Sequence, residues 1–326
     1  MHSTNSAYKR FDKINGNFKG KDIVSLDQFS QKDIKILFDE VPKMREIALN
    51  ARPSKIIEGK IVVLLFYEPS SRTFGSFSTA VKQIGGQTVE ILNPQDFSSI
   101  VKGETFEDTI RVFEAYSDAI ILRHPQVGSA SKAAQIAKLV PVINAGDGVG
   151  EHPTQTLLDL YTIYEKFGRL DNLTVLFAGD MLNGRTVHSL IKGLALYPKN
   201  TLYLLSLPSL KLSRKEYSNF LNLGIKLVEL ESVNDIPKNA DVWYWTRIQK
   251  ERFKSIKDYE KTSNKFVVNQ EFLDTYASKN TILMHPLPRV GEITPKVDDD
   301  PRAVYLKSQI RNGTYVRMAL LTKVLE

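Results

Sequence analysis

Short apolar runs alternate with helical patterns along most of the chain, and this alternation restricts the fold more than any other feature of the sequence. The run from Lys60 to Phe66 is rich in β-branched residues and predicts a buried strand. Apolar residues then recur at helical spacing from Phe77 to Ile84 and stop at Gly85, a residue type that often ends a helix. Strands that alternate with helices in this way are typical of α/β proteins with mainly parallel, doubly wound sheets.

The alternation starts again after about residue 152, which predicts two such domains. We expect the first domain to cover 20–152 together with a C-terminal helix at 304–326, and the second to cover 168–303, with a linking helix at 153–167. The stretch 302–326 is interpreted as a helix interrupted at Asn312-Gly313. Residues 1–19 are polar and are expected to be disordered; whether they are the remnant of a targeting leader stays open. Further strands are expected at 87–92, 118–123, 141–144, 173–178, 201–206, 242–246 and 281–284, and further helices at 34–44, 104–116, 129–139, 185–197 and 213–223.

Composition excludes several classes of protein. No run of about 18 apolar residues is present, so no segment is expected to span a membrane. The chain has no cysteine, which removes disulfides, thiolate metal sites and cysteine nucleophiles and fits a reducing compartment; we expect the cytoplasm. The net charge of +7 is spread along the chain without a block of like charges or a nucleic-acid-binding motif, and it therefore favours small anionic substrates over nucleic acid.

The segment Ser70-Ser71-Arg72-Thr73 lies where the first strand passes into the next helix. The N–H groups of a helix's first turn favour an anion, hydroxyl groups add donors, and the guanidinium of Arg72 matches the oxygens of a phosphate. The alternative interpretation is that a serine only caps the helix and that Arg72 is a solvated surface residue. The segment is not a Walker loop, because G-x-x-x-x-G-K-[ST] does not occur in the chain.

Polar and basic residues also follow five other predicted strands, at 123–126, 146–152, 179–185, 246–249 and 285–288. In parallel sheets, ligands bind outside the carboxyl ends of the strands. Each of these residues alone would be interpreted as surface charge. Their joint placement predicts an anionic ligand in the cleft between the two domains.

Eight motifs, in order from about residue 20 to the end of the chain, closely resemble those of the catalytic chains in the aspartate carbamoyltransferase family. They are Ser-Ser-Arg-Thr at 70–73, Lys-Gly-Glu-Thr at 102–105, Arg-His-Pro-Gln at 123–126, Asn-Ala-Gly-Asp-Gly at 144–148, His-Pro-Thr-Gln-Thr at 152–156, Gly-Arg-Thr-Val-His-Ser at 184–189, Thr-Arg-Ile-Gln-Lys-Glu-Arg at 246–252 and His-Pro-Leu-Pro-Arg at 285–289. Ornithine-type members typically have a cysteine where this chain has Pro286, whereas aspartate-type members share the Thr-Arg-x-Gln pattern of 246–249. The resemblance is therefore to the aspartate type.

The resemblance implies transfer of the carbamoyl group of carbamoyl phosphate to the α-amine of L-aspartate, giving N-carbamoyl-L-aspartate and phosphate, in de novo pyrimidine biosynthesis. It implies no cofactor and no metal. A histidine with a pKa of about 6.5 can act as a neutral donor to the carbamoyl oxygen. By the same resemblance, the catalytic residues are Arg72, Thr73, Lys102, Arg123 and His152, and carbamoyl phosphate contacts these five together with Ser70, Ser71, Ser98, Gln155, Pro286 and Leu287.

The second substrate would be held by arginine forks that suit its two carboxylates. An i, i+2 spacing places Arg247 and Gln249 on the same side of an extended segment. In this family the loop that contains Ser98 comes from the neighbouring subunit, so the resemblance implies a homotrimer with active sites shared between subunits. The residues expected to contact aspartate are Lys102, Arg185, Arg247, Gln249 and Leu287.

The chain departs from the family pattern at Phe74, where an arginine is usual, and the consequence of this change stays open. Two alternative functions also stay open. One is a non-catalytic homologue that serves as a partner in a larger assembly, and the other is an enzyme of the same fold that uses a different amine, such as an acetylated ornithine. Neither a regulatory chain nor an association with other enzymes of the pathway follows from the sequence.

Overall fold

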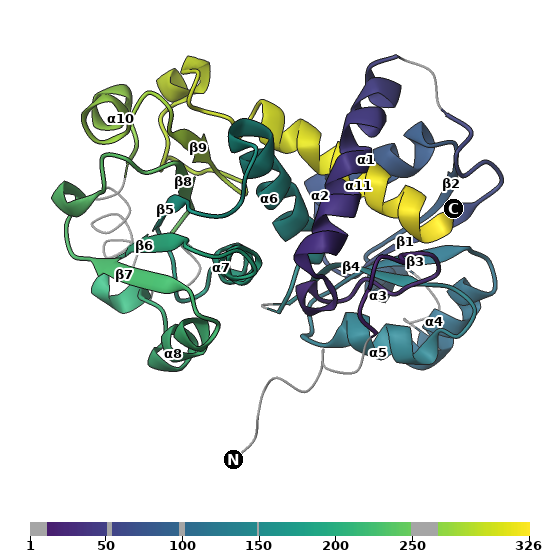
Figure 1. Ribbon diagram of the computed structural model, residues 1–326. Helices are drawn as coiled ribbons and strands as arrows, with labels where there is room; N and C mark the ends of the chain where they lie inside the picture. Colours follow the sequence, from purple (N-terminus) through teal and green to yellow (C-terminus); the bar gives the residue numbers. More distant parts are fainter. Residues whose placement is uncertain (1–11, 51–53, 98–101, 149, 249–266) are drawn as a thin grey trace. The chain divides into compact units, whose positions relative to one another are not determined.

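The computed structural model describes residues 12–50, 54–97, 102–148, 150–248 and 267–326 (Figure 1). The chain forms two compact units. Unit 1 comprises Met1–Tyr161 and Arg311–Glu326, and unit 2 comprises Thr162–Ile310. Each unit contains one all-parallel sheet, which confirms the predicted α/β fold with two parallel-sheet domains.

The sheet of unit 1 has four strands in the order β2-β1-β3-β4. The strands are β1 (Ile61–Phe66), β2 (Gln87–Leu92), β3 (Ala119–His124) and β4 (Val142–Asp147). Val62 of β1 pairs with Thr88 on one side and with Ala119 on the other. β1 is buried from Val62 to Phe66, as expected for a central strand that is covered on both faces.

Helices cover both faces of this sheet; α4 and α5 lie on one face, and α2 and α11 on the other (Figure 1). Side chains alternate along β1 between the two faces, and Val63 and Leu65 pack in one cluster with Ile110 of α4 and Ala130 of α5. The helices that contribute to unit 1 are η1 (Leu26–Gln28), α1 (Gln31–Leu49), α2 (Ser71–Gln83), α3 (Pro94–Phe97), α4 (Phe106–Glu114), α5 (Ser129–Ile136), the first part of α6 (Pro153–Phe167) and most of α11 (Ser308–Leu325).

α11 is continuous through Asn312 and Gly313, so the predicted interruption of the C-terminal helix is wrong. Asn312 is fully buried and accepts a hydrogen bond from Nη2 of Arg45 in α1 at 3.2 Å. A Cβ atom at Gly313 would lie 3.3 Å from the side chain of Leu158 in α6. These two residues therefore allow close packing of α11 against its neighbours, and the surrounding contacts outweigh the low helix propensity of Asn-Gly.

The N-terminal segment is ordered from Asp12 onward, so the prediction of disorder over 1–19 is wrong for 12–19; residues 1–11 lie outside the described part of the chain. Ile14 and Phe18 are buried. The N–H of Ile14 donates to the carbonyl oxygen of Gln28 at 3.0 Å, and the Phe18 ring packs against Phe29 with centroids 6.0 Å apart. Two apolar side chains thus anchor a polar segment that has no periodic pattern.

The sheet of unit 2 has five strands in the order β7-β6-β5-β8-β9. Four of them, β5 (Thr174–Ala178), β6 (Thr201–Leu205), β8 (Val242–Trp245) and β9 (Ile282–Met284), lie where strands were predicted. The edge strand β7 (Lys226–Leu230) was not predicted. Its Lys226 and Glu229 are exposed, and these charged residues interrupt the apolar run by which a strand would be predicted.

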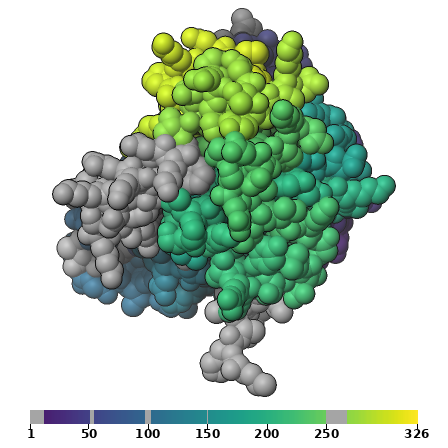
Figure 2. Space-filling model, turned by 90° about the vertical axis from the view of Figure 1, so that its left-hand side faces the viewer, coloured from purple at the N-terminus to yellow at the C-terminus, as the bar shows by residue number. Residues whose placement is uncertain are grey.

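One face of this second sheet carries an aromatic cluster. Trp243 and Trp245 point to this face, where their rings lie 5.9 and 5.8 Å from Phe272 of α10. The segment that carries α10 and β9 forms the yellow-green top of unit 2, and the segment with β6, α8 and β7 lies below it in green (Figure 2). The helices of unit 2 are α7 (Arg185–Ala195), η3 (Pro208–Leu210), α8 (Arg214–Asn222), η4 (Val233–Asp235), α10 (Gln270–Tyr276) and η7 (Pro295–Asp299).

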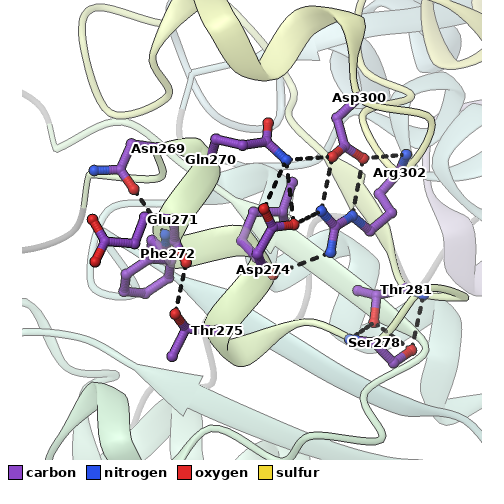
Figure 3. Close-up of polar contacts among 11 residues, drawn as sticks. Asn269, Gln270, Glu271, Phe272, Asp274, Thr275, Ser278, Thr281, Asp300 and Arg302 are labelled. Atoms are coloured by element: carbon purple, nitrogen blue, oxygen red, sulfur yellow. Dashed lines mark hydrogen bonds and ion pairs between the residues drawn. The ribbon is translucent and has the colours of Figure 1, made fainter.

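A half-buried arginine, Arg302, connects α10 to the segment that precedes α11 (Figure 3). Its Nε and Nη2 donate to the two carboxylate oxygens of Asp300 at 2.9 and 2.8 Å, and Nη2 also pairs with Asp274 of α10. Nη1 donates to the carbonyl oxygen of Leu273 at 3.2 Å.

In the described part of the chain, no helix combines the length and the apolar character needed to cross a membrane.

Candidate active site

The turn from β1 into α2 presents the hydroxyl groups that the sequence indicated. Ser70 is the N-cap residue of α2, yet its side chain makes no capping hydrogen bond, which removes support for the interpretation of Ser70 as a simple cap. Ser71 and Arg72 are exposed, and Thr73 is half-buried. The backbone N–H groups of a helix's first turn lack partners within the helix, so this turn offers both N–H and O–H donors to an anion.

Phe74 follows this segment and turns its ring inward. The ring meets Phe66, the last residue of β1, edge to face with centroids 5.5 Å apart and planes at 87°. This is a favourable aromatic geometry. The residue that replaces the family's usual arginine is therefore used for packing between α2 and the end of β1.

Arg123 lies at the end of β3, next to β1 in the sheet, and pairs in register with Phe66. Only 8% of the residue is exposed. Its Nη2 lies 3.0 Å from a carboxylate oxygen of Glu68, and its Nη1 donates to the carbonyl oxygen of Ala145 at 3.2 Å. These contacts compensate the buried charge and hold the guanidinium between the segment after β1 and the end of β4.

Gly146 in β4 brings Arg123 close to His152. Gly146 has a φ of +113°, which a residue with a side chain rarely adopts. A Cβ atom built on it would lie 2.6 Å from Nη1 of Arg123 and 3.4 Å from Cδ2 of His152. The guanidinium and the imidazole edge that contains Cδ2 therefore face the same point, and only glycine leaves room for both.

His152 is 4% exposed and precedes α6, which begins at Pro153 as predicted. Its Nδ1 lies 3.4 Å from the hydroxyl oxygen of Thr154. One turn further along α6, Nε2 of Gln155 donates to both carboxylate oxygens of Asp159, at 3.1 and 3.2 Å. Neighbouring side chains at the start of α6 thus orient His152 and Gln155, the two residues there that were predicted to contact a ligand.

Asp147 at the end of β4 supports the loop that leads to His152. One of its carboxylate oxygens accepts the N–H of Gly128 at 2.8 Å, and the other accepts the N–H of Glu151 at 2.9 Å. Glu151 in turn accepts the N–H of Leu26 at 2.9 Å. These buried bonds fix the path of the chain into α6.

His124, beside Arg123, has a structural role that the sequence did not reveal. Its Nδ1 accepts the N–H of Gln126 at 3.0 Å and lies 2.8 Å from the hydroxyl of Ser129. The ring packs 4.5 Å from that of Tyr67, and burial lowers the pKa of His124 below its ordinary value. A neutral His124 therefore shapes the turn between β3 and α5.

In unit 2, the residues after β5 and β8 are locked together at the start of α7. A Cβ atom at Gly179 would lie 2.3 Å from the carbonyl oxygen of Thr246, so these two backbones touch. The hydroxyl of Thr246 accepts the N–H of Asp180 at 3.2 Å, and Asp180 accepts the N–H of Asn183 at 2.9 Å. This turn ends at Arg185, the half-buried first residue of α7.

Arg247 follows β8 and is half-buried. β8 lies between β5 and β9, so Arg247, Arg185 and the residues after β9 follow the carboxyl ends of three adjacent parallel strands. Lys102 is exposed in a short turn. Two predicted site residues, Ser98 and Gln249, lie outside the described part of the chain.

A buried histidine and a half-buried glutamate shape the turn after β9. Leu287 has a φ of +55°, and the Leu287–Pro288 peptide bond is cis. Nδ1 of His285 accepts the N–H of Leu287 at 2.8 Å, and its Nε2 lies 2.8 Å from a carboxylate oxygen of Glu292. The sequence pattern assigns no role to Glu292. Only its nearness in sequence to the motif that contains His285 could have indicated its importance.

Two family models match the chain one after the other. The carbamoyl-P binding domain of aspartate/ornithine carbamoyltransferase matches residues 21–165, and the Asp/Orn binding domain of the same family matches residues 171–324. The chain belongs to the aspartate/ornithine carbamoyltransferase family. The resemblance found in the sequence motifs is therefore confirmed.

Individual members of the family are similar over most of this carbamoyltransferase chain. The aspartate carbamoyltransferase catalytic subunit of Methanocaldococcus jannaschii is 44% identical over 94% of this chain and 98% of that protein. The chloroplastic enzyme of Arabidopsis thaliana is 44% identical over 94% of this chain and 78% of that protein. The multifunctional protein pyr1-3 of Dictyostelium discoideum is 45% identical over 96% of this chain, which spans only 14% of that protein's length.

Solved structures of the family share the fold. The catalytic subunit of M. jannaschii aspartate transcarbamoylase matches with a TM-score of 0.87 and 44% identity, over 93% of this chain and 97% of that one. Aspartate transcarbamoylase from Trypanosoma cruzi, in complex with carbamoyl phosphate and aspartate, matches with a TM-score of 0.86 and 35% identity, over 95% and 96% of the two chains.

In this carbamoyltransferase, the structure brings predicted residues together within each unit. In unit 1 they follow β1, β3 and β4, which are neighbours in the sheet, and we call Ser70 to Thr73, Arg123 and His152 the unit 1 cluster. In unit 2 they follow β5, β8 and β9, and we call Arg185, Arg247, Pro286 and Leu287 the unit 2 cluster. The described residues contain no group of three or more histidine, aspartate or glutamate side chains arranged to hold a metal ion. The predicted cleft between the domains stays a prediction.

Proposed function

We propose that this chain transfers the carbamoyl group of carbamoyl phosphate to the amine of L-aspartate, giving N-carbamoyl-L-aspartate and phosphate in de novo pyrimidine biosynthesis. The observation that carries the proposal is the 44% identity with an aspartate carbamoyltransferase catalytic subunit over 94% of this chain. The unit 1 cluster, at the ends of adjacent parallel strands, supports it because such edges bind ligands.

The phosphate group of carbamoyl phosphate binds at the start of α2. The hydroxyls of Ser70, Ser71 and Thr73 donate to its oxygens together with the backbone N–H groups of the first turn, and the helix dipole adds a favourable field. Arg72 stabilises the charge that develops on the leaving phosphate, because its planar fork matches two phosphate oxygens.

The carbamoyl oxygen becomes negatively charged when the amine attacks the carbonyl carbon. Thr73, Arg123 and His152 donate to this oxygen. Donors aimed at such an oxyanion contribute about 3 to 4 kcal/mol each to transition-state stabilisation. Arg123 is suited to this role because Glu68 and Ala145 already fix its guanidinium, so that little reorganisation is required during the reaction.

The carbamoyl NH₂ group is held by acceptors. Gln155 and the backbone carbonyls of Pro286 and Leu287 take its two N–H groups, and a proline can do so because it lacks only the N–H donor. The hydrogen bond from Leu287 to His285 supports this role, because it fixes the turn whose carbonyl groups are used.

Aspartate binds through Arg185, Arg247 and Gln249, with Lys102 and Leu287 as further contacts. The neutral amine attacks the carbamoyl carbon, the bond from that carbon to the phosphate oxygen breaks, and the proton that the amine loses is taken up by the departing phosphate. The atoms and electrons balance without a redox cofactor, and we propose none and no metal.

We further propose a homotrimer in the cytoplasm, in which Ser98 and Lys102 of a neighbouring subunit complete each active site. The exposure of Lys102 supports this arrangement, because a side chain that serves another subunit must leave its own. The proposal predicts that the activity depends on protein concentration where trimers dissociate.

The test is to supply purified protein with carbamoyl phosphate and either L-aspartate, L-ornithine or N-acetyl-L-ornithine, and to quantify the carbamoylated amine. Product from aspartate alone is expected. No product from a folded trimer would favour a non-catalytic homologue. Product from ornithine or acetylornithine in place of aspartate would show that the proposed second substrate is wrong. Sedimentation run on the same sample separates failed assembly from absent chemistry.

A further inference from the structure

Arg317 of α11 is a buried cation in unit 1, away from the residues assigned above to either substrate. It is 4% exposed. Its Nη1 donates to the hydroxyl of Ser76 in α2 at 2.9 Å and to the carbonyl oxygen of Gly313 at 3.2 Å, and its guanidinium lies 4.9 Å from the centre of the Phe77 ring. Burial of such a charge costs folding free energy unless hydrogen bonds and nearby opposite charges compensate it. A buried cation that is kept at this cost is a candidate for a functional role.

The remaining contact of this guanidinium leads toward the active site. Nη2 of Arg317 lies 3.4 Å from the hydroxyl oxygen of Thr154, and the same oxygen lies 3.4 Å from Nδ1 of His152. An arginine side chain has only donors, so Thr154 must accept this hydrogen bond. Thr154 is fully buried, and its own hydroxyl proton needs an acceptor, which Nδ1 of His152 provides.

This direction of hydrogen bonding decides where His152 carries its proton. If Nδ1 accepts from Thr154, the neutral ring is protonated at Nε2. Cδ2, the carbon bonded to Nε2, belongs to the edge that faces the Arg123 side of Gly146. The proton therefore lies toward the side of the ring where Arg123 lies, and it is available as a hydrogen-bond donor.

Charged groups lie on both sides of the imidazole. Arg317 lies behind the Nδ1 side and Arg123 lies on the Cδ2 side. Glu68 pairs with Arg123, and Asp159 acts on Arg317. Burial lowers the pKa of Arg317 to about 10, partly opposed by Asp159, and at neutral pH the guanidinium still carries its charge.

We propose that Arg317 is a positioning residue that acts through Thr154 to hold His152 in the neutral tautomer with its proton on Nε2. The role of that proton, donation to the carbamoyl oxygen, rests on the proposed function. The tautomer itself does not, because it can be measured without turnover. The same guanidinium also ties α2 to α6, the two helices whose first turns contain Ser71 to Thr73 and Gln155.

The test uses protein with ¹⁵N-labelled histidine rings and long-range proton–nitrogen spectra. The chain has five histidines, and the signal that disappears in His152→Gln identifies His152. The wild-type ring is expected to show an unprotonated Nδ1 and a protonated Nε2. Thr154→Val keeps the shape but removes the hydroxyl, and it should shift the tautomer ratio toward Nδ1–H by about two- to tenfold, the size of one neutral hydrogen bond. Thr154→Ser is the matched control and should restore the wild-type spectrum.

A second variant, Arg317→Met, tests whether the guanidinium acts through Thr154. It should shift the ratio in the same direction as Thr154→Val, and the double variant should add little to either single change. Wild-type Nδ1 found protonated, or unchanged ring signals in Thr154→Val, would overturn the proposal. The expected spectra together with no carbamoyl aspartate from wild type would instead overturn the proposed function alone.

Discussion

Glu292→Ala should destabilise unit 2 and disturb the turn at 285–288. His285 is buried and Glu292 is half-buried, with side chains 1% and 10% exposed. Since Nδ1 of His285 accepts the N–H of Leu287, its proton lies on Nε2 and is donated to Glu292 at 2.8 Å. The variant leaves this buried N–H without its acceptor. A hydrogen bond to a charged group contributes about 1.5 to 3 kcal/mol, and we expect a loss of that size.

The same change should weaken substrate binding, because Leu287 keeps its φ of +55° with the help of His285. The free energy of unfolding is measured by urea denaturation at one fixed protein concentration, and KM for carbamoyl phosphate is measured in parallel. Glu292→Gln is the matched control, since its amide oxygen still accepts the hydrogen bond. A loss below about 0.5 kcal/mol in Glu292→Ala with an unchanged KM would refute the reasoning.

The pH dependence of this contribution has a defined sign. Burial raises the pKa of Glu292. The hydrogen bond from His285 and the backbone N–H donors lower this pKa by a larger amount, so the net pKa lies below its ordinary value of 4.5. A carboxyl group with a depressed folded-state pKa adds stability above its unfolded pKa and loses it as the pH falls through the folded value. The advantage of wild type over Glu292→Gln should therefore shrink below about pH 4.5, and an advantage that grows with acid would contradict the assignment.

Three further substitutions test other parts of the molecule. Gly146→Ala would place a Cβ 2.6 Å from the Arg123 guanidinium at a φ of +113°. We expect the free energy of unfolding in urea to fall by about 1 to 3 kcal/mol and kcat to fall as well. Unchanged turnover would show that the reaction does not require Arg123 and His152 to meet at Gly146. Arg302→Ala removes one partner of an ion pair whose side chains are only 10% and 7% exposed, and it should cost about 3 kcal/mol. Lys35→Ala, from an exposed pair, should cost less than about 0.5 kcal/mol, and equal losses would contradict the role of burial. Arg72→Ala should abolish carbamoyl transfer with an unchanged far-ultraviolet circular dichroism spectrum, and near wild-type turnover would exclude Arg72 from catalysis.

The elements that the sequence predicted correctly are those with a strong local pattern. β1 is a continuous apolar run, and α1 begins with the expected capping box, in which Asp33 accepts the N–H of Ser30 at 2.8 Å. β7 and α10 were missed for physical reasons. β7 is a short edge strand with charged, exposed residues, and α10 spans only Gln270–Tyr276, too few residues to show a helical period.

The candidate site divides in the same way. That Ser70 to Thr73, Arg123 and His152 follow neighbouring strands could be predicted, because ligand-binding residues collect at the carboxyl ends of a parallel sheet. Their supporting partners could not. Thr154 and Arg317 are separated by 163 positions, and no local pattern indicates that α11 carries a charge to the back of His152.

Two buried arginines near His152 are held in different ways, and the difference bears on what each can do. Arg123 has its charge compensated directly by Glu68, so its guanidinium is fixed and its field is reduced. Arg317 donates its hydrogen bonds to the neutral acceptors Ser76, Gly313 and Thr154, and Asp159 offsets its charge only electrostatically. A neutral imidazole between them can donate a hydrogen bond from Nε2 to an oxyanion, and the cations on both sides of the ring then add to the stabilisation of that negative charge.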